Sequence, residues 1–286
     1  MEIIVLSFIA AAIIIALSAV IYYQNKRIDV TRYDVYDEKL PQGFDGVRIV
    51  QISDLHNSSF GKHNVRLIGE IKAAEPDYIF ITGDYIDARK VDFKATDFLS
   101  QNITEIAPVY FCTGNHERRH AYVLKKLEKS FRKHGVRSLR NSYVYLSRSD
   151  SRIRLIGSDD PAFLKRKLDN EEKEELLYER LSHLCSERDY NILLSHKPNY
   201  YRIYESSGAD LVFSGHAHGG QFRLPSGIPL YTPDEGFFPR YAQGLHKIGN
   251  MILIVSRGLG QSIIPFRINN SPELVIVTLH SSTGEN

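Results

Sequence analysis

Short apolar runs that alternate with helical segments constrain the fold of this chain more than any other feature of its sequence. The runs have the length and the Val, Ile and Leu content of buried strands, whereas the segments between them place apolar residues three and four positions apart. The predicted helices cover about 62–75, 118–134 and 171–187, and the predicted strands cover 47–53, 78–82, 109–113, 153–158, 191–195, 211–214, 251–256 and 273–279. Alternating strands and helices predict an α/β protein.

The beginning of the chain differs from the rest because it contains a long uncharged run. Residues 3–23 read IIVLSFIAAAIIIALSAVIYY, and a helix of this length, at about 1.5 Å per residue, spans the roughly 30 Å hydrocarbon core of a bilayer. A cleaved signal peptide is the alternative, but no Lys or Arg precedes the run and it stays apolar beyond Ala19. We expect a retained transmembrane anchor (1–26), a juxtamembrane linker (27–45) and one globular domain (46–281).

Charges bear on the location and the partners of the protein. Lys26, Arg27 and Arg32 follow the apolar run, whereas only Glu2 and the amino terminus precede it. The positive-inside rule then predicts a single-pass protein of the cell membrane with its domain in the cytoplasm. Lys and Arg number 36 against 34 Asp and Glu. Because this balance is close to neutral and no long basic run occurs, we expect no nucleic-acid partner.

Polar residues that can bind metals directly follow five of the predicted strands, in SDLH, TGDYID, TGNHE, SHKP and GHAH. Any one of them alone would more often be a turn residue or a surface histidine. Ligands of open α/β sheets bind beyond the carboxyl ends of the strands, so the five loops can converge on one crevice. The candidate metal ligands are Asp54, His56, Asp84, Asn115, His196, His216 and His218.

The chemistry of this set indicates the metals. Imidazole nitrogens with carboxylate and amide oxygens, and no thiolate, suit Mn²⁺, Fe or Zn²⁺. Seven ligands are too many for one such ion. If one carboxylate bridges, the set divides into two groups of four, which is the arrangement of a two-metal hydrolase.

In this order, SDLH, GD, GNHE, SH and GHAH resemble the five signature blocks of the calcineurin-like metallophosphoesterase superfamily. GHAHGGQ and SRGLGQSIIPFRINNSPEL resemble the bacterial membrane-associated phosphodiesterase subgroup, and the resemblance covers about residues 45–280. It implies a four-layer sandwich of two mixed β-sheets flanked by helices, beside the N-terminal transmembrane helix. It also implies two divalent metal ions, with His116 as the catalytic imidazole and Asp84 as the bridge. The implied ligand groups are Asp54, His56, Asp84 and His218 for one ion and Asp84, Asn115, His196 and His216 for the other.

The expected reaction is hydrolysis of a phosphodiester or pyrophosphate bond by attack of a metal-bound hydroxide. A protonated His116 then gives the leaving oxygen its proton. The membrane anchor leads us to hypothesise a lipid-linked phosphoester substrate. A non-catalytic metal-bound interaction scaffold of the same fold is disfavoured because every ligand and His116 are present. A nuclease is disfavoured by the near-neutral charge and the anchor.

Other residues near the predicted strand ends have less specific roles. We expect Asp87 to form a turn or to support a ligand by hydrogen bonding, and Glu117 to begin the following helix, where a carboxylate suits the helix dipole. Arg267 has two open interpretations, contact with a substrate phosphate or pairing with a structural acid. Residues 237–241 also have two, an apolar lip for an acyl chain or packed aromatic side chains.

Overall fold

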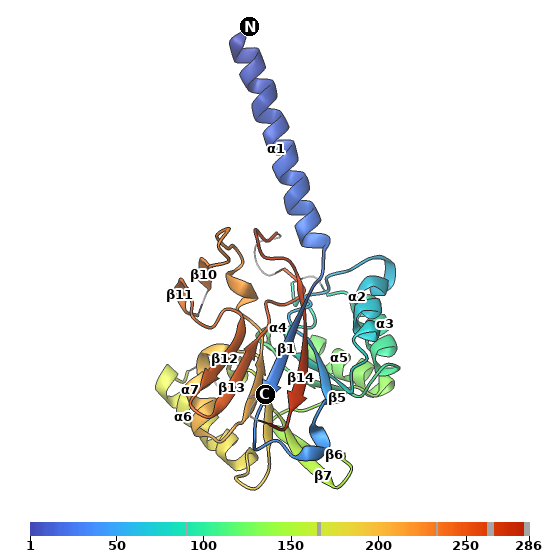
Figure 1. Ribbon diagram of the computed structural model, residues 1–286, viewed down its shortest axis with the longest axis vertical. Coiled ribbons are helices and arrows are strands. Elements are labelled where there is room, and N and C mark those ends of the chain that lie inside the picture. The colour runs from blue at the N-terminus through green and yellow to red at the C-terminus, as the bar shows by residue number, and fades with distance from the viewer. Residues whose placement is uncertain (90, 165–166, 233, 262–265, 283–286) are drawn as a thin grey trace.

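Two six-stranded β-sheets stacked face to face form the centre of the protein, with helices on both outer faces (Figure 1). The computed structural model describes residues 1–89, 91–164, 167–232, 234–261 and 266–282. In order across the first sheet, the strands are β1 (Asp29–Tyr36), β14 (Glu273–His280), β2 (Arg48–Ile52), β3 (Tyr78–Thr82), β4 (Val109–Cys112) and β5 (Arg137–Ser138). The second sheet runs through β12 (Gly244–Ile248), β13 (Met251–Val255), β9 (Leu211–Ser214), β8 (Asn191–Leu194), β7 (Ser151–Gly157) and β6 (Ser142–Arg148).

Alternating side chains of the central strands fill two different cores. On β3, Phe80 points toward the second sheet, whereas Ile79 and Ile81 point toward the outer helices. The ring of Phe80 packs edge-on against Phe213 of β9, with the centroids 5.3 Å apart. These strands are buried on both faces, and for this reason they read as continuous apolar runs in the sequence.

Each outer face is covered by helices with one apolar stripe. Leu67 of α2 (Val65–Ala73), Leu99 of α3 (Phe93–Thr104) and Leu127 of α5 (Ala121–His134) lie in the core outside the first sheet. Leu181 of α6 (Asn170–Leu184) and Tyr204 of α7 (Tyr201–Ser206) lie in the core outside the second. The smaller elements are α4 (Asn115–Arg119), β10 (Tyr231–Thr232), β11 (Gly236–Phe237) and the 3₁₀ turns Gln42–Phe44, Lys62–Asn64, Pro161–Phe163, Pro198–Tyr200 and His218–Gly220. The predicted four-layer α/β sandwich is confirmed.

The first sheet begins before residue 46, where we expect the domain to start from the sequence. Residues 29–36, which the sequence places in a linker, form the edge strand β1, paired in parallel with β14 from Asp29 opposite Glu273 to Tyr36 opposite His280. An edge strand is buried less than a central one, so its sequence DVTRYDVY lacks a continuous apolar run. The folded domain therefore includes most of the predicted linker.

The N-terminal helix α1 (Glu2–Lys26) projects away from the domain (Figure 1). It is long and apolar enough to cross a membrane, and none of its residues is buried. Its last turn is nevertheless attached to the domain. The Asn25 amide donates to the carbonyl of Arg267 at 2.9 Å and accepts from the backbone N–H of Arg267 at 2.8 Å. The Gln261 amide also donates to Asn25, at 2.9 Å.

These contacts predict where the helix can be removed without harm. Deleting residues 1–23 keeps Asn25, whereas deleting residues 1–26 leaves its partners without their hydrogen bonds. Polar groups that lose their hydrogen-bond partners lower the free energy of unfolding by about 1–3 kcal/mol. We therefore expect the longer deletion to have the lower urea midpoint of unfolding. Asn25→Ala within the shorter deletion is the matched control and should reproduce most of the difference. Equal midpoints for both truncations would mean that the Asn25 contacts add nothing to stability.

Candidate metal centre

Five loops at one edge of the sandwich hold the seven candidate ligands. They follow the carboxyl ends of β2, β3 and β4 in the first sheet and of β8 and β9 in the second. The sheets are joined just before this edge, where the Gln51 amide of β2 donates to the carbonyl of Ser214 of β9 at 2.8 Å. Parallel strands of two facing sheets thus deliver residues that are far apart in sequence to one place.

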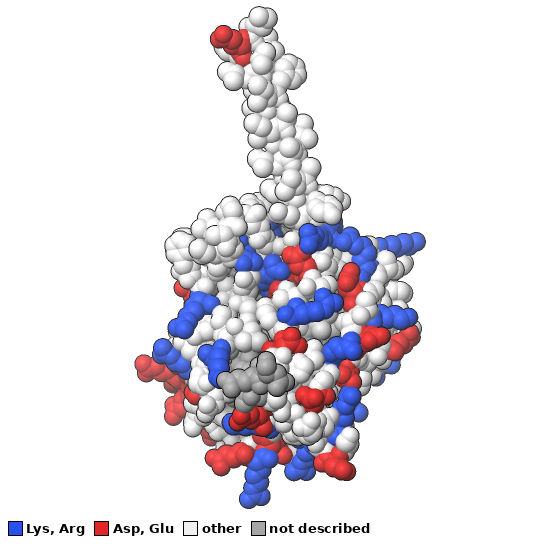
Figure 2. Space-filling model, viewed as in Figure 1, with Lys and Arg blue, Asp and Glu red and all other residues white. Residues whose placement is uncertain are grey.

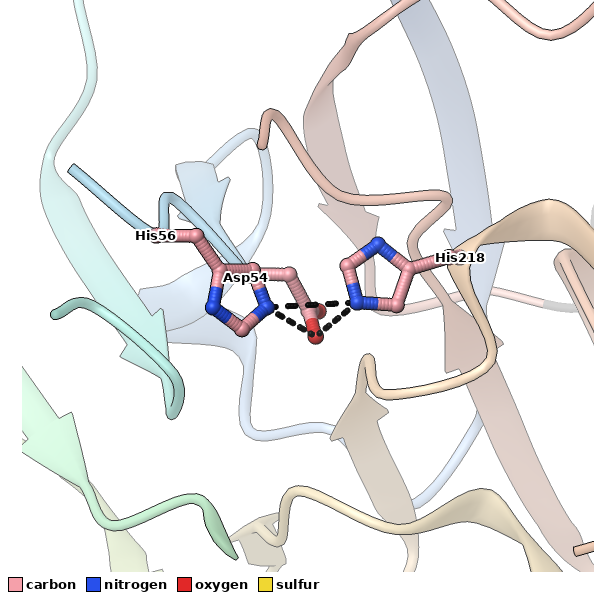
Figure 3. Close-up of side chains that lie close together, drawn as sticks. All are labelled: Asp54, His56 and His218. Carbon is pink, nitrogen blue, oxygen red and sulfur yellow. Dashed lines mark hydrogen bonds and ion pairs between the residues drawn. The ribbon is translucent and has the colours of Figure 1, made fainter. Parts of the chain in front are cut away.

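One group consists of Asp54, His56 and His218, whose side chains are almost completely buried and point toward one another (Figure 3). His218 Nε2 lies 3.3 Å from Asp54 Oδ1 and 3.2 Å from His56 Nε2. A carboxylate oxygen and two imidazole nitrogens facing one another in this way can hold a cation.

A second group consists of Asp84, His196 and His216. His196 Nε2 lies 3.4 Å from Asp84 Oδ2 and 3.2 Å from His216 Nδ1. The same oxygen of Asp84 lies 3.5 Å from His56 Nε2 of the first group. Asp84 therefore stands between the two groups, where a bridging carboxylate must be, although its role as a ligand stays a prediction.

The donor atoms themselves fit a divalent metal. The Nδ1 of His196 donates to the carbonyl of Thr82 at 2.7 Å, so the lone pair of the neutral ring is on Nε2, which faces the other ligands. Among the described residues, the buried Oδ1 of Asn115 has no hydrogen-bond partner. A buried amide oxygen without a hydrogen-bond partner lowers the free energy of unfolding, and coordination of a metal ion would compensate for the missing bond.

Electrostatics at the centre favour bound positive charge. Burial lowers the pKa of His56 and of His218, so both rings are neutral, as metal ligands must be. Burial also opposes charge on His196, but the carboxylates of Asp84 and Asp54 outweigh it and raise its pKa to about 10. The buried acids therefore attract a cation to the side of the centre where His196 lies.

Backbone strain marks the same residues. Asp54, His56, Asp84, His216 and His218 all have positive φ between 45° and 65°. A left-handed backbone costs an L-residue roughly 1–2 kcal/mol, so five such residues in one cluster need compensation from their surroundings. Two of the compensating bonds run from the backbone N–H of His216 to Asp54 Oδ2, at 2.9 Å, and from the backbone N–H of His116 to Asp84 Oδ1, at 2.8 Å. Strain of this kind is typical of functional sites.

Gly215 shows how little space the strained loops leave. A Cβ at this position would lie 1.9 Å from Ser53 Oγ and 2.3 Å from Asp54 Oδ2. The loop after β9 can approach the loop after β2 only without a side chain here.

Glu117 holds two of the loops together, a role beyond the helix start that we expect from the sequence. Its buried carboxylate accepts from the backbone N–H of Gly114 at 2.7 Å, of Asp84 at 2.9 Å and of Ile86 at 3.3 Å. Burial and the nearby charge of Asp84 raise its pKa to about 7. Glu117 thus fixes the loop that carries Asp84 against the loop that carries Asn115.

His116 lies beside the first group, with its ring edge-on to His56 at a centroid distance of 4.5 Å. Its Nδ1 is 3.3 Å from Asp87 Oδ1 and accepts from the backbone N–H of Ala88 at 3.4 Å. Burial lowers the pKa of His116 to about 4. Asp87 therefore lies within ion-pair distance of His116, in keeping with the supporting role that the sequence leaves open for it. His56, Asp87 and His116 are also close enough to hold an ion of their own.

Arg267 fits neither of the two interpretations that the sequence leaves open. Its side chain is completely buried and donates to the carbonyls of Gly260 and Arg257, the latter at 2.8 Å, and to His218 Nδ1 at 3.1 Å. Among the described residues, no carboxylate forms an ion pair with it, and burial lowers its pKa to about 10. Arg267 thus orients the His218 ring by a hydrogen bond to Nδ1, whereas Nε2 faces Asp54 and His56.

Asp234 is a contact of the centre that the sequence does not indicate. Its Oδ2 accepts from His216 Nε2 at 2.7 Å and from Lys197 Nζ at 2.8 Å. With its proton on Nε2, the neutral His216 ring presents the lone pair of Nδ1 to the centre. Asp234 lies in a loop of ordinary turn composition, so it carries no motif by which it could be found.

A pocket of about 350 Å³ adjoins the centre at Asn115. Arg118, Arg119 and Lys173 line it together with Pro161, Ala162 and Leu164. Three cations beside a candidate metal ligand suit a substrate that carries negative charge.

Comparison with known proteins shows which proteins this chain is similar to. Residues 47–220 match the family model described as calcineurin-like phosphoesterase. The uncharacterized metallophosphoesterase YkuE of Bacillus subtilis is 31% identical over 91% of this chain and 88% of its own length. The phosphodiesterase YaeI of Escherichia coli is 26% identical over 81% and 82%. The transmembrane protein with metallophosphoesterase domain of Danio rerio is 28% identical over 85% of this chain and 55% of its own.

The central place of Asp84 predicts what its loss does. Asp84→Asn keeps the shape of the side chain but removes the negative charge shared by both groups. We expect elemental analysis to find fewer than two divalent ions per chain, together with nearly complete loss of phosphoesterase activity. Asp210→Asn, at a buried acid that bonds Lys39 and Asn191 far from the centre, is the control and should keep its metal. Two tightly bound ions in Asp84→Asn would rule out the bridge.

Proposed function

The chain belongs to the calcineurin-like phosphoesterase family, and from this premise we propose that it hydrolyses phosphodiester or pyrophosphate bonds with two divalent metal ions. The observation that carries the proposal is the meeting of two ligand groups at Asp84, whose Oδ2 lies within 3.5 Å of His56 and within 3.4 Å of His196. Asp54, His56, Asp84 and His218 would hold one ion, and Asp84, Asn115, His196 and His216 the other. When bound, such ions stabilise charge on phosphoryl oxygens and activate water at neutral pH.

The residues around the ions have separate tasks in this reaction. In the neutral His116 ring, Nδ1 accepts from the Ala88 N–H, so the proton is on Nε2. When the ring is doubly protonated, Asp87 stabilises its charge from 3.3 Å and Nε2 again carries a proton. His116 can therefore donate a hydrogen bond from Nε2 to a leaving oxygen in both forms, but only the doubly protonated ring can transfer a proton to it. Its low pKa makes the neutral form the main one at pH 7, and that form acts by hydrogen bonding as charge develops.

The cationic pocket supports a substrate with more than one charged group. Arg118, Arg119 and Lys173 lie on the side of Asn115 where a second phosphate, or a charged substituent of a diester, would be bound. Arg side chains bind phosphate oxygens in pairs, which gives them geometric selectivity that a single ammonium lacks. This pocket supports pyrophosphate or substituted diester substrates over simple ones.

Membrane attachment is the second part of the proposal. Helix α1 has the length of a membrane span, and a transmembrane relative shares the domain. We propose that α1 is a retained single-pass anchor, with the domain on the cytoplasmic side because Lys26, Arg27 and Arg32 follow the helix. A lipid-linked phosphoester would then reach the centre at high local concentration. Extraction of the protein by detergent but not by carbonate, with an intact mass that includes residues 1–26, would support the anchor over a signal peptide.

A substrate panel tests the proposed reaction. The metal-free protein is loaded in turn with Mn²⁺, Fe²⁺ or Zn²⁺ and assayed in detergent or liposomes. The substrates are a soluble aryl diester, a lipid diester, a lipid pyrophosphate and single-stranded DNA. We expect hydrolysis that depends on the metal, with the lipid substrate preferred. Turnover of lipids no better than that of the soluble diester would refute the lipid hypothesis, and preference for DNA would favour a nuclease. No hydrolysis with any metal would favour the scaffold.

His116→Gln separates a catalytic imidazole from a metal ligand. We expect the variant to keep both ions and to lose a factor of about 10²–10⁴ in rate, the usual share of a general acid. The loss should be larger for an alkyl ester than for a nitrophenyl ester, whose leaving group needs no proton.

His120→Gln, at an exposed position four residues away, is the control and should keep its full rate. Equal losses with alkyl and nitrophenyl esters would leave only a role in binding or in charge stabilisation. Loss of an ion would make His116 a ligand.

A further inference from the structure

Six large apolar side chains are exposed together around the β10–β11 hairpin. We call them the apolar rim: Leu224, Ile228, Tyr231, Phe237, Phe238 and Phe266. Phe237 is 75% exposed and Phe238 64% exposed, whereas Tyr241, a few residues further on, is buried. Aromatic side chains exposed to this degree in one place are typical of an interaction surface.

The rim belongs to a defined structure. β10 pairs with β11 in antiparallel register, and the rings of Tyr231 and Phe237 pack edge-on with centroids 5.3 Å apart. Phe222 forms a β-bridge with Ile268, and its ring lies 5.7 Å from that of Phe266. The fold thus holds these side chains in a defined arrangement.

The rim lies at the end of the domain from which α1 emerges. Figure 1 shows β10 and β11 at the same end of the domain as the base of the helix, and Figure 2 shows an uncharged surface there, whereas charged side chains spread over the rest of this face. The connection is direct, because Arg267 follows Phe266 and exchanges two hydrogen bonds with Asn25 of the last helical turn. A bilayer crossed by α1 would therefore lie next to the rim.

The rim is also attached to the metal centre at two points. Asp234, in the turn between β10 and β11, accepts from His216 Nε2 at 2.7 Å. Arg267, the neighbour of Phe266, donates to His218 Nδ1 at 3.1 Å. Asp234 thus contacts the second ligand group and Arg267 the first. A surface that binds the apolar rim would therefore also influence the position of the ligands.

We propose that the apolar rim inserts into the same bilayer as α1 and seats the metal centre at the level of the lipid headgroups. The inference rests on the proposed membrane anchor. Aromatic side chains are favoured at the boundary between headgroups and acyl chains, and their insertion removes apolar surface from water. Lys26 and Arg27, at the end of α1, stand at the level where anionic headgroups attract positive charge. Substrates are then phosphoesters of membrane lipids that enter from the bilayer.

A fluorescent probe tests the insertion without any need for catalysis. The chain contains no tryptophan, so Phe237→Trp places a single one in the rim. The full-length variant is reconstituted into vesicles of phosphatidylcholine and phosphatidylglycerol, with or without bromine on the acyl chains. We expect blue-shifted emission that loses most of its intensity in the brominated vesicles.

Tyr178→Trp is the matched control. Tyr178 is 45% exposed on α6, outside the second sheet and away from the rim. Its emission should stay red-shifted and unquenched in the same vesicles. Quenching of Phe237→Trp no stronger than that of the control, in protein that floats with the vesicles, overturns the proposal. Blue-shifted emission without quenching also overturns it, and indicates a second copy of the chain on the rim. Protein that fails to float contradicts the anchor instead.

The double variant Phe237→Ser with Phe238→Ser connects the rim to substrate access. We expect hydrolysis of a lipid diester in vesicles to fall several-fold relative to hydrolysis of a soluble aryl diester by the same sample. Leu176→Ser with Tyr178→Ser, at exposed positions of α6, should leave this ratio unchanged. An unchanged ratio in the rim variant would overturn entry from the bilayer. Loss of both activities together with the metal would mean that the rim only stabilises the centre.

Discussion

The carboxylate of Asp84 lies where the two ligand groups of the candidate site meet. Its Oδ2 faces His56 and His196, which come from different sheets, and its Oδ1 accepts the backbone N–H of His116. The residue itself has a left-handed backbone, which Glu117 secures by accepting its N–H. A buried charge among neutral and charged imidazoles is stable only with this degree of compensation. The geometry of the centre thus depends on how the two sheets are stacked, because His56 and His196 come from different sheets.

A second set of contacts surrounds the ligands and links the centre to the outside of the domain. Arg267 reaches from His218 to the last turn of α1, and Asp234 reaches from His216 to the hairpin with the exposed aromatic side chains. Supporting contacts of this type set the orientation and basicity of ligand rings. The end of the domain from which α1 emerges and the candidate metal centre are therefore connected by hydrogen bonds, which agrees with the proposal that the substrate lies in a bilayer.

The central strands were predictable from the sequence, and so was the position of the seven candidate ligands at the strand ends, because both signals are local. A strand buried on both faces must be apolar along its length, and β3 is predicted at residues 78–82 as observed. Each ligand follows such a strand within a few residues, at the one place where an α/β sheet collects its functional side chains. The apolar run that becomes α1 is equally local.

The supporting residues were decided only by the tertiary structure. β1 is an edge strand whose partner β14 is more than 230 positions away, so nothing in its own sequence reveals the pairing. Arg267, Asp234 and Glu117 acquire their roles from atoms contributed by distant loops. A buried guanidinium held by backbone carbonyls has the same sequence signature as a surface arginine. The sequence alone determined which residues can bind metal, because ligand chemistry belongs to the side chain. Only the fold decided which residues orient them, because orientation depends on distances between segments that are remote along the chain.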